Sequence, residues 1–308
     1  MNSIPENNFP KRVTIELTSR CNLSCLFCPR QIFITPQDDI DDELFMAIID
    51  ECSKNLPVTL AMFFRGEPLL FGKLPEFIKY AKEKGLGPVQ LASNGLLLDS
   101  EAADSLLMSG LDFISFSLDT NDEGLYLQYR KNGNLIVSRK NILAFIKKAD
   151  YLRSHGKQVP EIQISSVDME KYRAKKDEFI EFWTKYADRV RIYEEHSADG
   201  NFGSLESKNC DASSSRTACN KVYSDIVIYY DGSVAICNHD WNNQMQLGNV
   251  KNQSIQEIWN GEKYQKLRRQ HIENRFEDGN ICKTCDHWRM YNTSEGFIGK
   301  LYLRQPLV

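Results

Sequence analysis

Residues 18–30 read TSRCNLSCLFCPR and place Cys21, Cys25 and Cys28 directly after the apolar segment Val13–Leu17. The β-branched residues of that segment predict a strand, so the cysteines are expected in the loop at its carboxyl end. With nine cysteines among 308 residues, a C-x3-C-x2-C triplet arises by chance in roughly one such chain in a hundred. The spacing therefore predicts a specific site.

Three closely spaced thiolates suit a cubane iron–sulfur cluster better than a single metal ion. Such a cluster has four irons and normally takes four thiolates, so three thiolates leave one iron open to a further ligand, as catalysis requires. The alternative is a zinc site whose fourth ligand is a distant histidine. The chain has five histidines and none lies near the triplet in sequence, so we expect iron and sulfur here.

Beyond the triplet, short apolar runs alternate with amphipathic stretches up to about residue 195, which is typical of repeated β–α units around a parallel sheet. The expected strands are Val13–Leu17, Val58–Phe64, Val89–Ser93, Phe113–Leu118, Ile162–Val167 and Val190–Tyr193. The expected helices are one that begins after an Asp41 N-cap, Leu74–Lys84, Glu101–Met108, Val137–His155 and Lys176–Ala187. Six units are fewer than the eight of a closed barrel, so the predicted fold class is α/β, a partial (β/α)6 TIM-like barrel with ligands at the carboxyl ends of its strands.

The composition changes after residue 195. Residues 196–218 are polar and rich in turn formers, which indicates a linker or loop. Residues 225–237, DIVIYYDGSVAIC, predict a β-hairpin turned at Asp231-Gly232, and an amphipathic helix is expected over about 254–270. The predicted organisation is a tail over residues 1–12, the barrel over 13–195, the linker over 196–218 and a small C-terminal domain, a hairpin plus a helix, over 219–308.

Four further cysteines belong to this small domain. Cys219 precedes the hairpin, Cys237 ends it, and Cys282 and Cys285 lie beyond the helix. Four thiolates complete the coordination of a cubane cluster or of a zinc ion and leave no open position. Spacing alone does not select between the two metals.

The first triplet, with the aromatic Phe27 before its last cysteine, resembles the signature of radical S-adenosylmethionine (radical SAM) enzymes. The resemblance implies a [4Fe–4S] cluster on the triplet whose open iron binds S-adenosylmethionine. It further implies reductive cleavage to a 5′-deoxyadenosyl radical that abstracts hydrogen from a C–H bond. Residues 64–68, FRGEP, look like the family's Gly-Gly-Glu element, in which Gly66 and Glu67 would meet the methionyl ammonium and Arg65 replaces the first glycine.

Polar residues at the ends of later strands extend the resemblance. Those after the third and fourth strands are similar to positions that reach the ribose and methionyl groups. Tyr126 and Arg130 resemble a Tyr-x-x-x-Arg pattern whose arginine pairs with the cofactor carboxylate. Ser165, with Ser166, loosely matches the stretch that lines adenine. The cofactor-binding residues implied are Phe27, Gly66, Glu67, Ser93, Asn94, Ser117, Asp119, Arg130 and Ser165.

The second group of cysteines, spaced C-x12-G-x4-C and then C-x2-C, resembles the auxiliary-cluster domain called SPASM in its shorter, one-cluster "twitch" form. The resemblance implies an auxiliary [4Fe–4S] cluster on Cys219, Cys237, Cys282 and Cys285. The molybdenum-cofactor cyclase is similar but uses three auxiliary cysteines and ends in Gly-Gly, whereas this chain ends in residues 305–308, QPLV. The cyclase is therefore not expected.

Known members of the short form oxidise or epimerise alcohols of sugars and aminocyclitols, which implies hydrogen abstraction at a carbinol carbon of a sugar-like substrate. Dehydrogenation is expected first, and epimerisation with Cys210 as hydrogen donor second. Glu194 or His239 is expected to remove the hydroxyl proton, and Trp241 to stack on a sugar face.

Each of these positions also has a non-catalytic alternative. The polar residues would be solvated loop residues, Trp241 would be a packing residue, and Cys210 would be a spare or structural thiol or a fifth candidate ligand of the second cysteine group. Other polar residues expected at the mouth of the barrel are Asp168, Glu195, His196, Asn238 and Asp240. Cys52 lies on the apolar face of the first helix and is expected in the core.

Other functions also remain open. Relatives that modify peptides often carry a leader-binding domain before the barrel, and only about a dozen residues precede the first strand here. That observation disfavours a peptide maturase without excluding it. A metal-stabilised binding module is the non-enzymatic alternative.

Charge and hydropathy exclude other classes. The 38 Lys and Arg residues against 42 Asp and Glu residues give a formal charge of −4, so there is no basic surplus for a nucleic acid. No apolar run approaches the ~20 residues of a membrane helix, and residues 1–12 lack the apolar stretch of a signal peptide. We expect a soluble, cytoplasmic protein whose partners are a small polar substrate and a one-electron donor such as flavodoxin or ferredoxin.

Overall fold

The structure, a computed structural model, describes residues 8–31, 36–194, 216–285, 287–288, 292 and 299–305. Within them the strands are β1 Arg12–Ile15, β2 Ser24–Cys25, β3 Thr59–Ala61, β4 Val89–Ser93, β5 Phe113–Ser117, β6 Arg130–Lys131, β7 Glu161–Asp168, β8 Arg189–Glu194, β9 Asp225–Ile228, β10 Ser233–Ala235, β11 Gly248–Asn249 and β12 Gly299–Leu303. The helices are α1 Asp42–Ser53, α2 Leu74–Glu83, α3 Ser100–Leu107, α4 Glu123–Tyr129, α5 Leu135–Ser154, α6 Lys176–Trp183, α7 Lys221–Ser224, α8 Ile255–Asn260 and α9 Glu262–Glu273.

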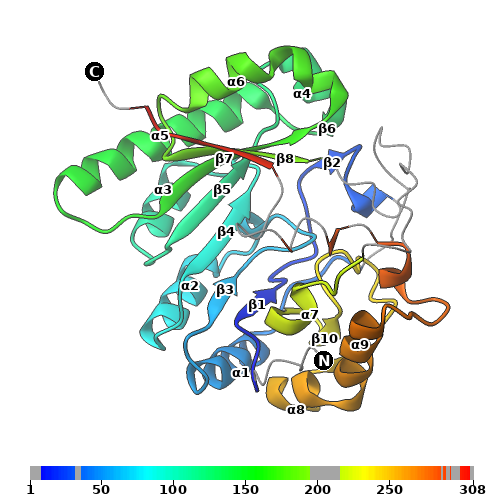
Figure 1. Ribbon diagram of the computed structural model, residues 1–308. Helices are drawn as coiled ribbons and strands as arrows, with labels where there is room; N and C mark the ends of the chain where they lie inside the picture. Colours follow the sequence, from blue (N-terminus) through cyan, green and yellow to red (C-terminus); the bar gives the residue numbers. More distant parts are fainter. Residues whose placement is uncertain are drawn as a thin grey trace.

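A ten-stranded sheet forms the centre of the described chain, in the order β11-β10-β9-β1-β3-β4-β5-β7-β8-β12. Neighbours from β9 through β8 are parallel, and α1, α2, α3 and α5 follow one another along the outer side of the sheet (Figure 1). The strands β1, β3, β4, β5, β7 and β8 are the six predicted barrel strands, in chain order. The predicted fold class, a partial α/β barrel, is therefore confirmed.

The barrel strands were recognisable because both of their faces are covered. Parallel strands buried on both sides appear in sequence as nearly continuous apolar runs. In β1, Val13 and Ile15 are fully buried, and in β5 Ile114 and Phe116 are fully buried. All four side chains belong to one core that also takes in the inner face of the helices.

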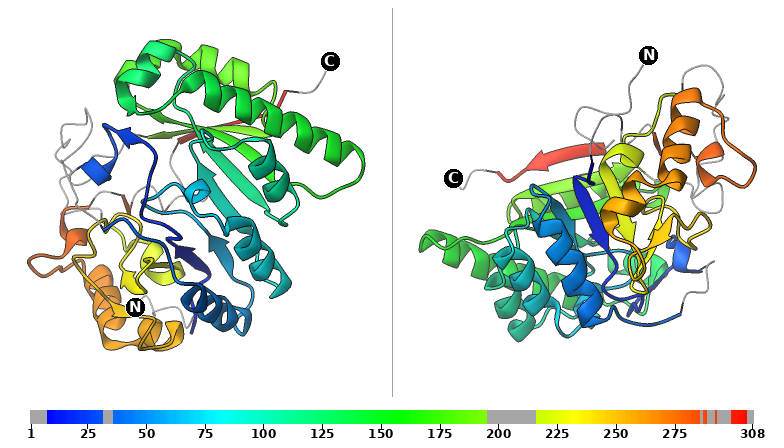
Figure 2. Two further views of the ribbon diagram at one scale, coloured as in Figure 1. Left: turned by 180° about the vertical axis from the view of Figure 1, so that it is seen from behind. Right: turned by 90° about the horizontal axis from the view of Figure 1, so that it is seen from below.

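Segments from the C-terminal part of the chain complete both edges of this sheet. The predicted hairpin at Asp231-Gly232 is present as β9 and β10; β9 lies parallel to β1, and β10 antiparallel to β9. At the opposite edge β12 lies antiparallel to β8, away from α8 and α9 in the left view of Figure 2. The predicted domain over residues 219–308 thus contributes to two opposite edges of the barrel sheet.

Two helix predictions had different outcomes. The side chain of Asp41 accepts hydrogen bonds from the amides of Glu43 and Leu44 at 3.0 and 3.2 Å, so the predicted N-cap of α1 is confirmed, and Cys52 is buried in the core as expected. The single helix predicted over about 254–270 is wrong, because Gly261 separates α8 from α9. Its backbone is extended, and a Cβ there would lie 2.9 Å from the carbonyl oxygen of Glu257.

None of the helices in the described ranges combines the length and apolarity that crossing a membrane requires.

Candidate active site

The cysteine triplet follows β1 and is attached to the far side of the barrel mouth by a small two-stranded sheet. Within it, Cys25 on β2 pairs with Arg130 on β6, and the amide of Cys28 donates to the carbonyl of Cys25 at 3.0 Å. Burial raises the pKa of Cys25 to about 11, and the charges of Cys28 and Cys21 act in the same direction. The three thiols are therefore electrostatic neighbours, as ligands of one cluster must be.

Arg130 is presented to the triplet by α4, a short helix that the sequence analysis did not predict. Asp122 caps α4 by accepting from the amide of Leu125 at 2.9 Å, and α4 buries Tyr126 just before Arg130. The guanidinium of Arg130 lies 4.0 Å from Cys25 Sγ, measured from Nη1. A fixed cation therefore stands beside the thiols.

A buried carboxylate holds Arg130 in this position. Arg130 Nε donates to Oδ2 of Asp119 at 2.7 Å, and the side chains of Arg130 and Asp119 are only 7% and 2% exposed. The other oxygen of Asp119 accepts from the amide of Val167 at 3.0 Å, which ties the pair to β7. Asp119 and Arg130, both predicted to contact the cofactor, are therefore bonded to each other.

Glu67 is 3% exposed and accepts three hydrogen bonds. It accepts from Ser93 Oγ at 2.7 Å, from the amide of Asn94 at 2.9 Å and from the amide of Leu69 at 3.2 Å. Burial raises its pKa, and these hydrogen bonds oppose the shift. A solvated turn residue, the bland alternative for a glutamate after a strand, does not describe this side chain.

The loop that carries Glu67 is locked to the loop that carries the triplet. The amide of Glu67 donates to the carbonyl of Arg20 at 2.8 Å. A Cβ on Gly66 would lie 2.0 Å from the carbonyl oxygen of Thr18, so only glycine allows this approach. Asn94 Nδ2 adds a bond to Asn22 Oδ1 at 2.8 Å.

Of the other predicted cofactor contacts, Ser117 ends β5, Ser165 lies beside it in β7, and Phe27 follows β2. Ser117 Oγ and Ser165 Oγ are 3.4 Å apart. Phe27 lies beneath the guanidinium of Arg130, with 5.4 Å between Cζ and the ring centroid. The structure therefore brings the predicted positions of the barrel to one mouth, as the rule for parallel strands requires.

Arg65 connects the barrel to the C-terminal hairpin through contacts that the sequence did not predict. Its Nε and Nη2 donate to the two oxygens of Glu16 at 2.6 and 2.5 Å, Nη1 donates to the carbonyl of Trp241 at 3.0 Å, and the guanidinium lies 3.8 Å from the ring centroid of Tyr229. The side chains of Arg65 and Glu16 are 5% and 0% exposed. Two sequence signals pointed to this connection: a glutamate inside an apolar strand, and an arginine where the family element has glycine.

The second group of cysteines lines one enclosed cavity. Cys219, Cys237, Cys282 and Cys285 share its wall with Arg216 and three histidines. Burial raises the pKa of Cys282, and the charges of Cys237, Cys285 and Cys219 raise it further. These four thiols are therefore mutual neighbours, which fits the predicted ligand set.

Both groups of cysteines are sets of thiols whose charges act on one another. Thiolates are the ligands that a cubane iron–sulfur cluster takes, each through a different iron. The residues present therefore fit the two clusters that the sequence predicts.

The predicted substrate residues are scattered. His239 stacks on His287 in the second cysteine cavity, with ring centroids 3.8 Å apart. Trp241 packs against Phe64 at 5.4 Å between centroids, and Asp168 pairs with Arg173 at 3.2 Å and with Lys176.

Asp240, also expected at the mouth, is buried and accepts from the amide of Gln244 at 2.8 Å. Cys210, Glu195 and His196 lie outside the described residues, as does the side chain of Glu194. The roles predicted for Glu194, His239 and Cys210 therefore stay predictions.

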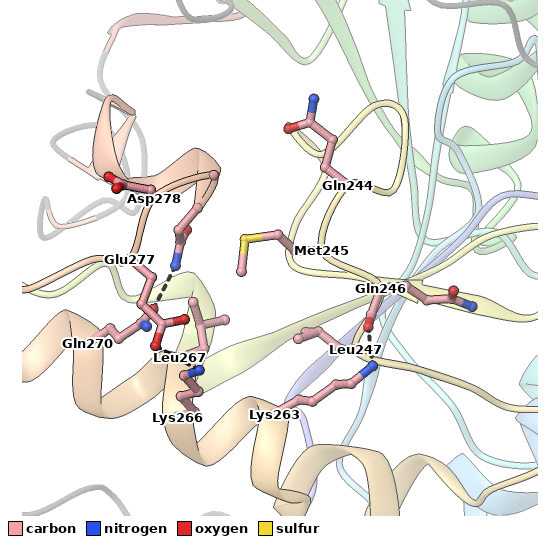
Figure 3. A pocket seen from close by; sticks show the side chains of 12 residues that line it. Gln244, Met245, Gln246, Leu247, Lys263, Lys266, Leu267, Gln270, Glu277 and Asp278 are labelled. Atoms are coloured by element: carbon pink, nitrogen blue, oxygen red, sulfur yellow. Dashed lines mark hydrogen bonds and ion pairs between the residues drawn. The ribbon is translucent and has the colours of Figure 1, made fainter.

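A separate pocket of about 500 Å³ lies between residues 244–247, α9 and residues 277–280 (Figure 3). Lys263 Nζ on its wall donates to the carbonyl of Gln246 at 2.8 Å, and Lys266 pairs with Glu277 at 2.8 Å. None of the residues that line it is a cysteine or a histidine. Its charged side chains are engaged in these contacts and in an ion pair between Asp278 and Lys283 at 2.7 Å.

Known proteins resemble this chain in both parts. Residues 15–156 match the model of the radical SAM superfamily, and residues 219–286 match that of an iron–sulfur cluster-binding domain, SPASM. A probable GTP 3′,8-cyclase of Methanococcus maripaludis is 33% identical over 134 residues, which are 42% of this chain and 43% of that protein. The chain covers less than half the length of the curated relatives that it resembles.

Solved structures show the same fold over nearly the whole chain. BtrN in complex with AdoMet and 2-DOIA superposes with a TM-score of 0.62 at 18% identity and covers 94% of this chain and 98% of its own. Streptococcus suis SuiB bound to precursor peptide SuiA gives a TM-score of 0.65 at 16% identity, covering 97% of this chain and 76% of its own. At these identities the likeness concerns the fold.

Proposed function

Because this chain belongs to the radical SAM superfamily and carries a C-terminal iron–sulfur cluster-binding domain, we propose that it is an enzyme that removes hydrogen from a carbinol carbon of a sugar-like or aminocyclitol-like substrate. The observation that carries this proposal is the meeting of three thiols with a buried glutamate and a buried arginine at the carboxyl mouth of the barrel. Dehydrogenation is the leading outcome and epimerisation the second.

Cys21, Cys25 and Cys28 would hold a [4Fe–4S] cluster, and S-adenosylmethionine would bind beside it. Once reduced by an external one-electron donor, the cluster would transfer one electron to the sulfonium of S-adenosylmethionine, and this chemistry would supply the 5′-deoxyadenosyl radical that abstracts the hydrogen. Cys219, Cys237, Cys282 and Cys285 would hold an auxiliary [4Fe–4S] cluster, which in a dehydrogenation would accept the second electron from the substrate.

The residues of the barrel would bind and orient the methionyl group. Glu67 accepts three hydrogen bonds, and since a carboxylate offers about four acceptor sites, one remains for an ammonium group. Burial strengthens that attraction because the local dielectric is low. Arg130, whose orientation is fixed by Asp119, presents its remaining N–H groups to a carboxylate.

For the substrate step, Glu194 or His239 would take the hydroxyl proton, and Cys210 would return a hydrogen atom in an epimerisation. BtrN was crystallised in complex with AdoMet and 2-DOIA, and its chain and this one cover each other almost completely, which supports a small-molecule substrate. The alternative is a peptide-modifying enzyme. The likeness to SuiB, whose crystal structure contains a precursor peptide, favours that alternative.

Deuterium transfer tests the proposal. Anaerobically reconstituted protein would be incubated with S-adenosylmethionine, a reductant and deuterated nucleotide sugars, aminocyclitols or peptides. We expect deuterium in 5′-deoxyadenosine with a sugar or aminocyclitol substrate, and a product lighter by two hydrogens. Absence of 5′-deoxyadenosine, together with zinc in place of iron and sulfide, would contradict the proposal and favour a binding module.

The same assay distinguishes the two outcomes. Epimerisation in deuterated water places one deuterium in a product of unchanged oxidation state, and Cys210→Ala abolishes that incorporation. Dehydrogenation does not respond to Cys210→Ala. Deuterium transfer from a peptide alone would establish the alternative function.

A further inference from the structure

His271, on the last turn of α9, lines the cavity of the second cysteine group and is 3% exposed. Two contacts fix its ring. Its Nδ1 lies 3.3 Å from the amide nitrogen of Cys219, and its ring is nearly perpendicular to that of Phe276, with the centroids 4.9 Å apart. The imidazole therefore has one orientation relative to a cysteine of the group.

The bond to Cys219 determines which nitrogen of His271 carries hydrogen. A backbone amide can only donate, so Nδ1 accepts and carries no hydrogen. The ring is then the neutral tautomer with its hydrogen on Nε2. This Nε2 is buried and has no hydrogen-bond partner among the described residues, an arrangement that is costly unless something else accepts the hydrogen bond.

The rest of the cavity wall has the same electrostatic character. Arg216 Nε is also buried without a partner among the described residues, while Nη1 of the same side chain donates to the carbonyl of Lys283 at 3.3 Å. Among the described residues that line the cavity there is no carboxylate. N–H donors and two cationic side chains, Arg216 and Lys221, therefore line the cavity together with the four thiols, as suits an acceptor with negative charge on its sulfur atoms.

We propose that His271 donates a hydrogen bond from Nε2 to a sulfur atom of the auxiliary cluster and thereby raises the reduction potential of that cluster. The inference rests on the proposed function only in requiring a cluster on Cys219, Cys237, Cys282 and Cys285. Hydrogen bonds to the sulfurs favour the more negative, reduced state, and they are among the factors that set cluster potentials. His271 acts through the cluster and does not touch the substrate.

Two substitutions separate the donor from the contact with Cys219. The amide of asparagine reaches the place of Nδ1, so His271→Asn keeps an acceptor for Cys219 and removes the donor. The amide of glutamine reaches the place of Nε2, so His271→Gln keeps a donor toward the cavity. His155→Asn, at the exposed end of α5, is the matched control.

The readout is the midpoint potential of the auxiliary cluster, measured by a redox titration followed by electron paramagnetic resonance. A Cys21→Ala/Cys25→Ala/Cys28→Ala background removes the other cluster from the signal. We expect His271→Asn to lower the potential, by about 59 mV if the bond contributes tenfold to the equilibrium for one-electron reduction. His271→Gln should restore most of the shift, and His155→Asn should leave the potential unchanged.

A His271→Asn protein with full auxiliary iron and sulfide and an unmoved potential would overturn the proposal. If that variant assembles no cluster, spectroscopy of the native protein labelled with 15N-histidine tests the hydrogen bond instead. Its reduced cluster should show an exchangeable proton and a 15N coupling, and the absence of both overturns the proposal as well. If the triple-alanine background contains no iron and sulfide, the proposed auxiliary cluster itself is refuted. If the His271→Asn variant contains the cluster and its midpoint potential is unchanged, only the role of His271 is refuted.

Discussion

The carboxylate of Glu67 is the side chain on which the loops around the cysteine triplet converge. It joins the end of β4, through Ser93 and Asn94, to a loop whose backbone is bonded to Arg20. A buried polar group is stable only when its hydrogen bonds are made, and a donor deprived of its acceptor loses about 1–3 kcal/mol. Glu67 is therefore both a binding candidate and a structural acceptor.

Glu67→Gln tests the structural part of this role. Glutamine replaces one acceptor oxygen by an NH2 group, so at least one buried donor loses its partner. We expect the free energy of unfolding, measured by urea titration, to fall by about 1–3 kcal/mol. Glu83→Gln, at an exposed position of α2, should stay within about 0.5 kcal/mol of the native protein, and an equal loss in both variants would contradict the assignment.

At the level of elements, Arg65 couples the barrel to the C-terminal hairpin. It follows β3 with a φ of +56°, a conformation that is uncommon for a residue other than glycine. Its partners are Glu16 from the end of β1, Tyr229 from the hairpin and the carbonyl of Trp241. Because the next two residues are Gly66 and Glu67, these contacts of Arg65 also fix the loop that lines the proposed S-adenosylmethionine site.

A double-mutant cycle measures this coupling. Arg65→Gln or Glu16→Gln alone leaves a buried charge without its partner, which costs about 3–5 kcal/mol. The double variant removes both charges, so its loss of unfolding free energy should be smaller than the sum of the two single losses. Additive losses, within the roughly 0.5 kcal/mol expected of independent sites, would show that the pair does not join the two elements.

The central feature of the whole molecule is that its cysteines form two separate groups, one of three and one of four. The triplet meets Glu67 and Arg130 at the mouth of the barrel, whereas the second group closes around its own cavity. Three ligands leave an iron for a cofactor, and four do not. Under the proposed function, this difference in ligand number places S-adenosylmethionine at the barrel and gives the auxiliary role to the C-terminal part.

Replacing Cys219, Cys237, Cys282 and Cys285 by alanine should separate the two clusters. Iron content of anaerobic preparations should fall from roughly eight to roughly four atoms per chain, since each cubane cluster holds four. Added S-adenosylmethionine should still change the electron paramagnetic resonance spectrum of the remaining reduced cluster. Cys52→Ala, in the core of the barrel, should keep the full iron content.

Two results would refute this division of roles. A quadruple variant that contains no iron would mean that the triplet does not bind a cluster by itself. A spectrum that S-adenosylmethionine leaves unchanged would mean that no iron of that cluster is open.

The amino-acid sequence by itself determined the six barrel strands and the two cysteine groups. Strands covered on both faces are apolar almost throughout, and cluster ligands are cysteines at short, characteristic spacings. Both patterns can therefore be read from the sequence alone. The N-cap of α1 and the hairpin turn at Asp231-Gly232 belong to the same class, because each depends on residues adjacent in the chain. The helix over 254–270 was wrong because its amphipathic period continues across Gly261 while the backbone does not.

Only the tertiary structure decided how distant residues pair. Arg65 with Glu16, Arg130 with Asp119, and His271 with Cys219 are separated by 49, 11 and 52 positions, and no periodicity in the sequence relates them. Each is a buried polar group whose partner is selected by the low dielectric around it, since an unsatisfied donor or charge is costly there. The placement of β12 on β8, opposite the hairpin, also depends on the tertiary structure. The backbone N–H and C=O groups at a sheet edge can pair with any strand that the fold brings there, so the sequence does not specify the partner.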